Sequence, residues 1–179
     1  QPNLLEATIS ASTNINCVSA TSGDATVVVS GGTAPFTFLW DDVNAQTTAS
    51  ATGLTAGTYH VTVTDSHGCT ATATVTITQN PPPAISNCPA VPLARNTNTG
   101  VCSYTISGTE MDLTATSVCP ITYTYSLTGA TNISNISGTL NGVVLQKGIT
   151  HITCVVADAL QSSTCSFDVV VSDHEVPAI

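Results

Sequence analysis

Short runs in which apolar residues alternate with threonine recur along the chain, and turn residues interrupt them about every ten positions. In residues 58–64, Tyr59, Val61 and Val63 alternate with threonine and histidine. Because successive side chains of a strand point to opposite faces, this period of two gives one apolar face and one polar face. No stretch keeps an apolar period of 3.6 residues between helix caps. The pattern therefore predicts an all-β protein with almost no helix.

The expected strands lie between clusters of glycine, aspartate, serine and proline. In the N-terminal half they are residues 4–10, 25–30, 36–40, 58–64 and 69–78. In the C-terminal half they are residues 101–107, 121–127, 142–146, 149–157 and 164–172. Many short strands with this spacing are typical of sandwiches such as the immunoglobulin fold, in which Trp40 would pack in the core.

Three consecutive prolines at 81–83 mark the clearest boundary, because proline cannot donate to a sheet and holds an extended, semi-rigid backbone. We therefore expect one sandwich at 1–80, a linker at 81–83 and a second sandwich at 84–179, in an extended tandem arrangement. The first three residues, Gln-Pro-Asn, resemble residues 79–81 at the start of this linker. The last three residues, Pro-Ala-Ile, repeat residues 83–85, where the second domain begins. Such echoes are typical of an array of repeated modules.

The charge balance excludes one class of partner. Only Arg95 and Lys147 are basic against 11 acidic residues, and the formal net charge is −9. No electropositive surface is available on which a nucleic-acid backbone could release its counterions, so we expect no nucleic-acid partner. No stretch approaches the length of a membrane-spanning helix, so we expect no membrane insertion either.

The chain has seven cysteines and no Cys-x-x-Cys pair, which favours disulfides and an oxidising compartment over a zinc site. A secreted or cell-surface protein is therefore expected. Cys17 and Cys69 are the two cysteines of the first domain, and we expect them to pair. Together with Trp40 between them, they would resemble the core of an immunoglobulin-like sandwich.

Five cysteines in the second domain leave more than one scheme open. The favoured scheme pairs Cys88 with Cys165, because terminal strands can lie side by side, and Cys102 with Cys119, which would close a short loop. Cys154 is then a buried free thiol. The alternative pairs Cys102 with Cys154, since both alternate in phase with apolar neighbours and would bridge the two sheets.

Carboxylates near the domain junctions are candidates for calcium ligands, because hard oxygen ligands often stiffen extracellular arrays. No EF-hand spacing is present, so solvated loop acids are the competing interpretation, and no other cofactor is expected. The candidates are Asp24, Asp41, Asp42, Asp65, Asp112, Asp158, Asp173 and Glu175.

Three further polar motifs receive structural interpretations. Residues 65–67 are Asp-Ser-His, but adjacent positions of a tight turn cannot form a hydrolytic triad, so a polar hairpin turn is expected. His60 and His151 alternate onto solvent faces. Asn132 and Asn135 match the N-glycosylation acceptor and mark an exposed polar loop.

The first domain resembles the SprB-type repeat of giant surface adhesins of gliding bacteria. The resemblance covers most of residues 1–80 and rests on four motifs. They are the run 31–40 (Gly-Gly-Thr-Ala-Pro-Phe-Thr-Phe-Leu-Trp), the run 53–65 that begins Gly-Leu-Thr-Ala-Gly-Thr-Tyr, Gly-Cys-Thr at 68–70 and Thr-Ile-Thr-Gln at 76–79.

The second domain resembles the hyalin-repeat (HYR) domain, an immunoglobulin-like extracellular module. The matching segments are 85–89 (Ile-Ser-Asn-Cys-Pro), 100–102, 119–120, 148–152, 157–158 and 165–171. The chain departs from that family at Cys154, where an aromatic residue is usual, and at residues 117–118, where Asp-Asn is usual. The first departure supplies the odd thiol, and the second weakens the case for calcium at that turn.

The two resemblances imply tandem extracellular modules that are exported by the type IX pathway, and neither family is known for chemistry. We expect a non-enzymatic, adhesive and structural segment that acts as a rigid spacer. Its partners would be neighbouring repeats, identical subunits of a fibre, or surface glycans. The alternative is a carbohydrate-binding or accessory module of a large secreted enzyme. Strand exchange through residues 4–10 would be one route to a filament.

Overall fold

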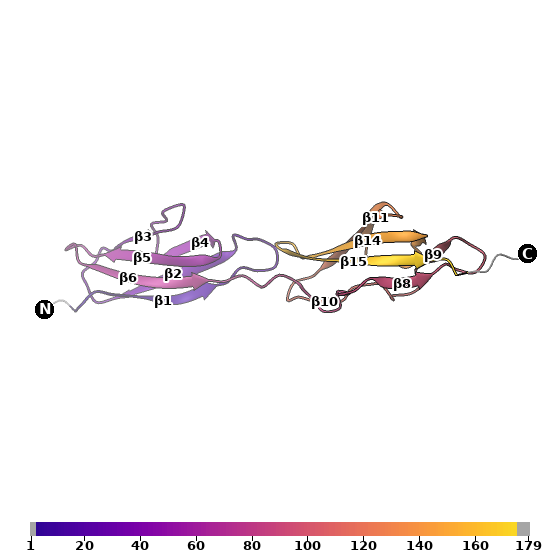
Figure 1. Cartoon of the computed structure of the whole chain (residues 1–179). Helices are drawn as coiled ribbons and strands as arrows, with labels where there is room; N and C mark the ends of the chain where they lie inside the picture. The colour runs from indigo at the N-terminus through magenta and orange to yellow at the C-terminus, as the bar shows by residue number, and fades with distance from the viewer. Residues whose placement is uncertain (1–2, 175–179) are drawn as a thin grey trace, which may run out of the picture. The chain divides into compact units, whose positions relative to one another are not determined.

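The computed structural model describes residues 3–174, and within that range every regular element is a β-strand (Figure 1). The chain divides into two compact units, Gln1–Asn80 and Pro81–Ile179. The division falls at the first proline of the expected linker. Each unit has its own sheets and its own core, as an immunoglobulin-like β-sandwich does.

Unit 1 is built from two three-stranded antiparallel sheets. One sheet has the order β1-β2-β4, with strands Glu6–Thr13, Gly23–Ser30 and Ser50–Leu54. The other has the order β3-β5-β6, with strands Thr37–Trp40, Gly57–Thr64 and Thr70–Ile77.

The core of unit 1 follows the alternation of its strands. Val61 and Val63 on β5 are fully buried, and Val27 on β2 faces them from the opposite sheet at 2% exposure. Trp40 is buried as predicted, and its indole Nε1 donates a hydrogen bond of 2.9 Å to the carbonyl of Thr48. That bond satisfies the one polar group of the ring inside the core.

The first and last strands of unit 1 lie beside each other, and their arrows run in the same direction (Figure 1). Beyond the end of β1, the Ile15 N–H donates to the Thr78 carbonyl at 2.9 Å, and the Thr78 N–H donates to Asn14 Oδ1 at the same distance. These residues follow the ends of both β1 and β6. β1 also pairs along its length with β2 of the same unit.

Unit 2 contains one five-stranded sheet and two short strand pairs. The sheet has the order β12-β11-β14-β15-β8, with strands Ile133–Ser137, Thr122–Gly129, Gly148–Ala157, Ser162–Ser172 and Leu93–Asn96. The pairs are β7 (Ala84–Ile85) with β10 (Ala115–Thr116), and β9 (Ser103–Thr105) with β13 (Val144–Gln146). All pairings are antiparallel except that of β8 with β15.

The core of unit 2 lies between the five-stranded sheet and the layer formed by the short pairs and their loops. Tyr125, Ile152 and Val169 project from the sheet and are fully buried. Leu140 and Leu145 face them from the opposite layer, also fully buried. The inward face of β15 agrees with the predicted alternation.

Several short strands have no counterpart in the sequence prediction. They are β4, β7, β8, β10 and β12, each two to five residues long. Runs this short contain too few apolar positions to show a period of two. The expected loop around Asn132 and Asn135 is therefore wrong in part, because Ile133–Ser137 is an edge strand paired with β11.

Candidate functional site

One disulfide joins the beginning of unit 2 to its last strand. Cys88 follows β7, Cys165 lies on β15, and their Cα atoms are 5.8 Å apart. The bond closes a sequence separation of 77 residues. The predicted Cys88–Cys165 pair is therefore confirmed.

The predicted Cys17–Cys69 pair is wrong, because Cys69 is a free, exposed cysteine. Cys17 follows Asn14 and Ile15, which bind Thr78 just beyond the end of β6. Cys69 instead immediately precedes the start of β6. Eight residues of strand separate the two positions by roughly 25 Å. A disulfide requires Cα atoms within about 7 Å.

Both predicted partners of Cys102 are also wrong, since Cys102 is free and exposed. It lies in the loop after β8, where Thr97 N–H donates to the carbonyl of Ser172 at the end of β15. Cys154 stands opposite Cys165 near the other end of β15, and Cys119 precedes the start of β11 near that same end. The length of the sheet thus separates Cys102 from both.

Cys154 is a buried free thiol, as the favoured scheme implied. Its side chain is fully buried opposite Tyr125 on β11. Burial raises the pKa of the Cys154 thiol, and the hydrogen bond with Tyr125 only partly offsets this. A thiol that stays protonated and inaccessible is not a nucleophile.

The Asp-Ser-His segment is a hairpin turn organised by its aspartate. Asp65 Oδ1 accepts hydrogen bonds of 2.9 Å from the N–H groups of His67 and Cys69, and Oδ2 accepts one of 3.1 Å from Thr33. Burial would raise the pKa of Asp65, but these N–H donors, with Cys69 foremost, outweigh it and hold the pKa below its usual value. The carboxylate therefore acts as a structural cap between two loops.

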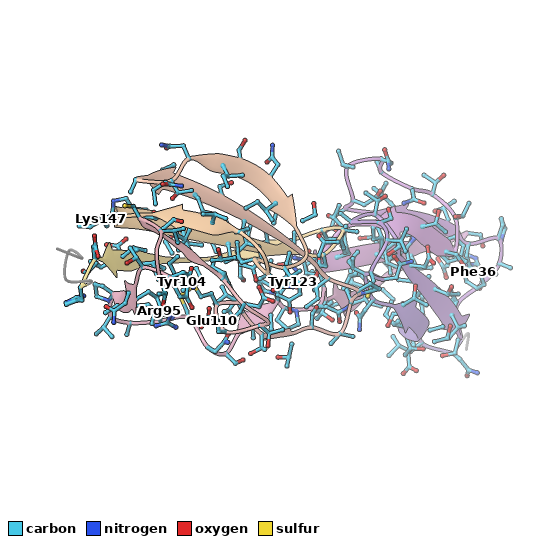
Figure 2. The ribbon with its side chains drawn as sticks, turned by 90° about the vertical axis from the view of Figure 1, so that its right-hand side faces the viewer. Phe36, Arg95, Tyr104, Glu110, Tyr123 and Lys147 are labelled. Carbon is cyan, nitrogen blue, oxygen red and sulfur yellow. A yellow bond between two sulfur atoms is a disulfide. The ribbon has the colours of Figure 1, made fainter. Side chains whose placement is uncertain are left out.

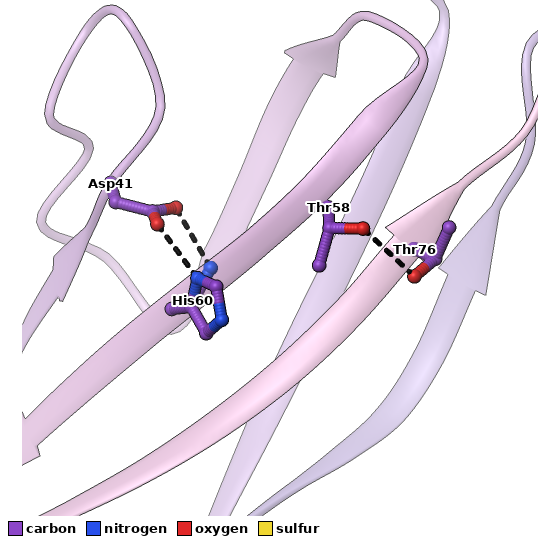
Figure 3. A network of polar contacts seen from close by, with 4 residues as sticks. All are labelled: Asp41, Thr58, His60 and Thr76. Carbon is purple, nitrogen blue, oxygen red and sulfur yellow. Dashed lines mark hydrogen bonds and ion pairs between the residues drawn. The ribbon is translucent and has the colours of Figure 1, made fainter.

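An exposed histidine–aspartate pair lies on the outer face of the β3-β5-β6 sheet (Figure 3). His60 Nδ1 is 2.8 Å from Asp41 Oδ2, and the His60 N–H donates to Asp41 Oδ1 at 2.7 Å. These hydrogen bonds, the backbone one first, lower the pKa of Asp41. On the same face, the hydroxyls of Thr58 and Thr76 lie 3.2 Å apart.

The outer face of β5 and β6 is almost entirely threonine. Its positions alternate with buried residues, and His60 is its one exception. The threonines are Thr58, Thr62, Thr64, Thr70, Thr72, Thr74 and Thr76. The predicted solvent-facing position of His60 is confirmed, and the face carries hydroxyl and methyl groups in place of lysine or glutamate.

A second histidine–aspartate pair occupies the outer face of unit 2. His151 Nδ1 contacts Asp168 Oδ1 across β14 and β15, and both side chains are partly exposed. Ser166 and Pro92 line the same shallow hollow. The Ser166 hydroxyl pairs with Thr153 at 3.0 Å, so the described groups form a polar network on a solvent face.

The two basic residues of the chain are each paired with carboxylates in unit 2. Arg95 on β8 lies 3.6 Å from Glu110 Oε2 and over the ring of Tyr104, 6.0 Å from its centroid (Figure 2). Tyr104 also donates to Glu110, which is the leading cause of the lowered pKa of Glu110. Lys147 Nζ lies 3.6 Å from Asp173 Oδ2. No local sequence pattern predicts the Arg95–Tyr104–Glu110 cluster, because its members come from separate segments.

The calcium candidates lie in separate local networks. Asp24 contacts Thr13, Asp158 caps the turn at 160–161, and Asp42 accepts hydrogen bonds from Asn44 and Gln46. Asp112 binds the turn at 139–140, and Asp41, Asp65 and Asp173 have the partners given above. Glu175 lies outside the described residues. Within residues 3–174, no three histidine, cysteine or carboxylate side chains gather as a metal site would require, and calcium binding stays a prediction.

In the part of the chain that the structure describes, no aromatic side chain is fully exposed. All eight phenylalanine, tyrosine and tryptophan residues are buried or half-buried. Tyr59 directs its hydroxyl to Thr55, and Phe36 is half-buried beside the turn of unit 1 (Figure 2).

The two glycosylation candidates are exposed on and beside β12. The Asn132 side-chain amide donates to the Gly129 carbonyl at 2.9 Å and accepts from the Gly129 N–H, so it closes the β11–β12 turn. Asn135 has a φ of 61° within the edge strand. That left-handed residue interrupts the strand, a feature that discourages pairing of an open edge with another chain.

The fold and its cysteines define a class of protein: two immunoglobulin-like β-sandwiches in tandem, one of which is closed by a disulfide. Within unit 1, residues 9–45 match the model of the SprB repeat family. No curated protein matches the chain significantly. Among the described residues, no helix is long and apolar enough to cross a membrane.

Solved structures with similar folds are multi-domain β proteins of low sequence identity. The three N-terminal domains of the bacteriophage RB49 Highly Immunogenic Outer Capsid protein (Hoc) are 15% identical, with a TM-score of 0.48, over 93% of this chain and 59% of that one. Drosophila N-cadherin EC1-3 is 15% identical, with a TM-score of 0.39, over 94% and 64%. Human Protocadherin-24 EC1-2 is 13% identical, with a TM-score of 0.39, over 87% and 90%.

Proposed function

We propose that this chain is a segment of a secreted cell-surface adhesin or extracellular fibre, in which its two sandwiches act as a rigid spacer. The observation that carries the proposal is the SprB-repeat match inside unit 1, followed by a second, disulfide-closed sandwich. The resemblance of unit 2 to the hyalin repeat supports the same function. Export by the type IX pathway of gliding bacteria is part of the proposal.

The strand arrangement of unit 1 suits a module that bears tension. β1 and β6 lie side by side in the same direction, so the chain enters the unit at one end of this pair and leaves at the other. Pulling on the two ends slides β1 along its neighbours and loads its ladder with β2 as a whole. A ladder whose hydrogen bonds are all loaded together withstands a higher force than a ladder whose bonds open one after another.

Neighbouring repeats and identical subunits of a fibre remain the proposed partners, and strand exchange is the less favoured route to assembly. β1, the strand that exchange would require, pairs with β2 of its own unit along its length. A glycan-binding or accessory module of a secreted enzyme is the second candidate, and glycan-array binding would support it. The buried and half-buried aromatic residues favour the spacer over this candidate.

The spacer role is tested with the protein's own thiols. Cys69 in unit 1 and Cys102 in unit 2 are free and exposed, so each takes a spin label, while buried Cys154 does not. Pulsed dipolar spectroscopy then gives the distribution of distances between the units. The control places both labels inside unit 2, on Cys102 and on a Ser162→Cys variant that also carries Cys69→Ser.

A rigid spacer gives an inter-unit distribution about as narrow as the control distribution. A distribution several times wider would refute the rigid-spacer role. The surface location is tested separately, with antibodies against this segment on intact cells of the source organism. Labelling only after the cells are permeabilised would refute an extracellular function.

A further inference from the structure

The free thiol of Cys154 lies next to the buried half of the Cys88–Cys165 disulfide. Cys154 on β14 and Cys165 on β15 stand directly opposite each other in the antiparallel ladder, and both side chains are buried in the core of unit 2. Cα atoms of opposite residues in such a ladder are about 4.5–5.5 Å apart, within the range of about 4.4–6.8 Å that disulfides span. Cys165 can therefore bond to Cys154 across the ladder as well as to Cys88, its partner in the folded unit.

Cys154 is the cysteine that Cys165 meets most often before the chain has folded. The two residues are 11 positions apart, the shortest separation between any two cysteines of the chain, whereas 77 positions separate Cys88 from Cys165. The probability of closing a flexible loop falls with about the 3/2 power of its length, so the shorter loop closes roughly 20 times more often in the unfolded chain.

The hairpin that brings Cys154 opposite Cys165 is held together locally. All ten residues of β14 pair with β15, and the turn between the strands covers residues 158–161. In that turn the Asp158 N–H donates to the Gln161 carbonyl at 2.9 Å, and Asp158 Oδ1 accepts from the Leu160 and Gln161 N–H groups at 2.8 Å each. Because a hairpin needs only near neighbours in the sequence, it forms before contacts between distant segments.

The segment that carries Cys88 is held by contacts with distant parts of the chain. β7, just before Cys88, makes a two-residue pairing with β10, and the Ser86 N–H donates to the Thr114 carbonyl at 3.0 Å. Cys88 itself is exposed, so its thiol is in contact with water before the disulfide forms. Cys88 is thus the later and the more accessible partner of Cys165.

We propose that Cys154 is a relay in the oxidative folding of unit 2, which first forms a disulfide with Cys165 and is then displaced by Cys88. In the first step, an external disulfide takes two electrons from the thiols of Cys154 and Cys165 and leaves as two thiols. In the second step, the Cys88 thiolate attacks Cys165 Sγ. The Cys88–Cys165 bond forms, the Cys154–Cys165 bond breaks, and its electron pair goes to Cys154 Sγ, which takes up a proton. This role does not depend on the spacer function.

Burial makes the second step hard to reverse. In the folded unit, burial raises the pKa of the Cys154 thiol, and the hydrogen bond with Tyr125 only partly offsets this. The thiolate is the form that attacks a disulfide, so a protonated and shielded thiol does not attack the Cys88–Cys165 bond. After its use the relay is therefore retained as the buried free thiol of the folded unit.

Oxidative refolding of the full chain tests the proposal. The chain is unfolded and reduced, then refolded with oxidised glutathione, and acid stops the exchange at successive times. Cleavage at Asp158 separates Cys154 from Cys165, and mass spectrometry then identifies which peptides are joined. The peptides must be identified, rather than the thiols counted, because Cys17 and Cys119 also form disulfides in the folded chain.

Three variants accompany the parent chain. Cys154→Ala removes the relay, and Cys88→Ala removes the thiol that displaces it. Cys69→Ala is the matched control, since it removes a free cysteine from unit 1. The parent time course needs no substitution, so it decides the order of the two bonds even if a variant fails to fold.

In the parent chain, we expect the Cys154–Cys165 bond to appear first and to decline as the Cys88–Cys165 bond replaces it. Cys88→Ala should keep the Cys154–Cys165 bond. Cys154→Ala should form the Cys88–Cys165 bond more slowly, by a factor of up to about 20, which is the ratio of the two loop closures. Cys69→Ala should match the parent rate.

Several results would overturn the proposal. One is a parent chain in which the Cys88–Cys165 bond forms with no earlier Cys154–Cys165 bond. Another is a Cys154→Ala chain that forms the Cys88–Cys165 bond as fast as the parent, or an equal delay in Cys69→Ala. Free thiols at both Cys154 and Cys165 after oxidation of Cys88→Ala would overturn it as well.

Discussion

Two tyrosines of β11 make the same kind of hydrogen bond at different depths, and this contrast predicts different costs for removing their hydroxyls. The Leu113 N–H donates to the Tyr125 hydroxyl at 3.1 Å, and the Ala115 N–H donates to the Tyr123 hydroxyl at 3.1 Å. Tyr125 is fully buried, and burial raises its pKa to about 12. Tyr123 is half-buried.

Tyr125→Phe leaves the Leu113 N–H without an acceptor in a place that water cannot reach. An unsatisfied buried donor costs about 1–3 kcal/mol of unfolding free energy. For a domain of this size, each kcal/mol lowers the melting temperature by about 4–8 °C. Tyr123→Phe should cost less than about 1 kcal/mol, because water can replace its half-buried hydroxyl.

Thermal unfolding followed by circular dichroism measures both variants, and hydrogen exchange at the Leu113 amide locates the effect. The fluorescence of Trp40, the chain's one tryptophan, reports on unit 1 and should not change. Equal losses for Tyr125→Phe and Tyr123→Phe would refute the reasoning, since depth of burial would then not decide the cost. Unchanged exchange at Leu113 in Tyr125→Phe would refute it as well.

Three other predictions concern thiols, acid and an unsatisfied hydroxyl. Iodoacetamide should modify exposed Cys69 in the native protein and buried Cys154 only after unfolding, which peptide mass spectrometry would show. Folding lowers the pKa of Asp42 and of Asp65 below the usual value of 3.8, so both carboxylates stabilise unit 1 when the pH is above 3.8. This stabilisation is lost as the pH falls through their pKa values in the folded state. Denaturant titrations read by tryptophan fluorescence should therefore show constant stability near neutral pH and a decline below about pH 4. Thr150 Oγ1 is buried without a hydrogen-bond partner among the described residues, so Thr150→Val should stabilise unit 2 by about 1 kcal/mol, and a lower melting temperature would contradict this.

Alternation predicted the long strands because each has one face in the core. On β5, Val61 and Val63 are buried, while His60 on the other face is exposed and Thr62 is half-buried. Along β15, Val169 and Val171 are buried, while Val170 between them is half-buried. The short strand β8 shows no such pattern, although its parallel pairing with β15 completes the sheet. The position of β8 depends on β15, which is far away in the sequence, so a local alternation of residues cannot predict it.

The cysteines show the same division between local and distant information. Cys88 and Cys165 were predicted to meet because they flank the first and last strands of their unit, where topology alone brings chain segments together. The predicted partner of Cys69 rests on a count of cysteines, and those of Cys102 rest on a short loop or on alternation in phase with apolar neighbours. None of these features shows which end of a sheet a residue occupies. Both lie at strand ends distant from those partners, and geometry leaves them free.

The functional interpretation depends on the same distinction. In the described residues, the polar pairs named above lie on strand faces and in turns. What converges in each unit is the chain itself: β1 beside β6 in unit 1, and Cys88 bonded to Cys165 in unit 2. Arrangements that join the first and last segments of a module govern how it responds to being pulled. The proposed spacer role therefore depends on how the ends of each unit are anchored, which the sequence indicates through the terminal strands and, in unit 2, through Cys88 and Cys165.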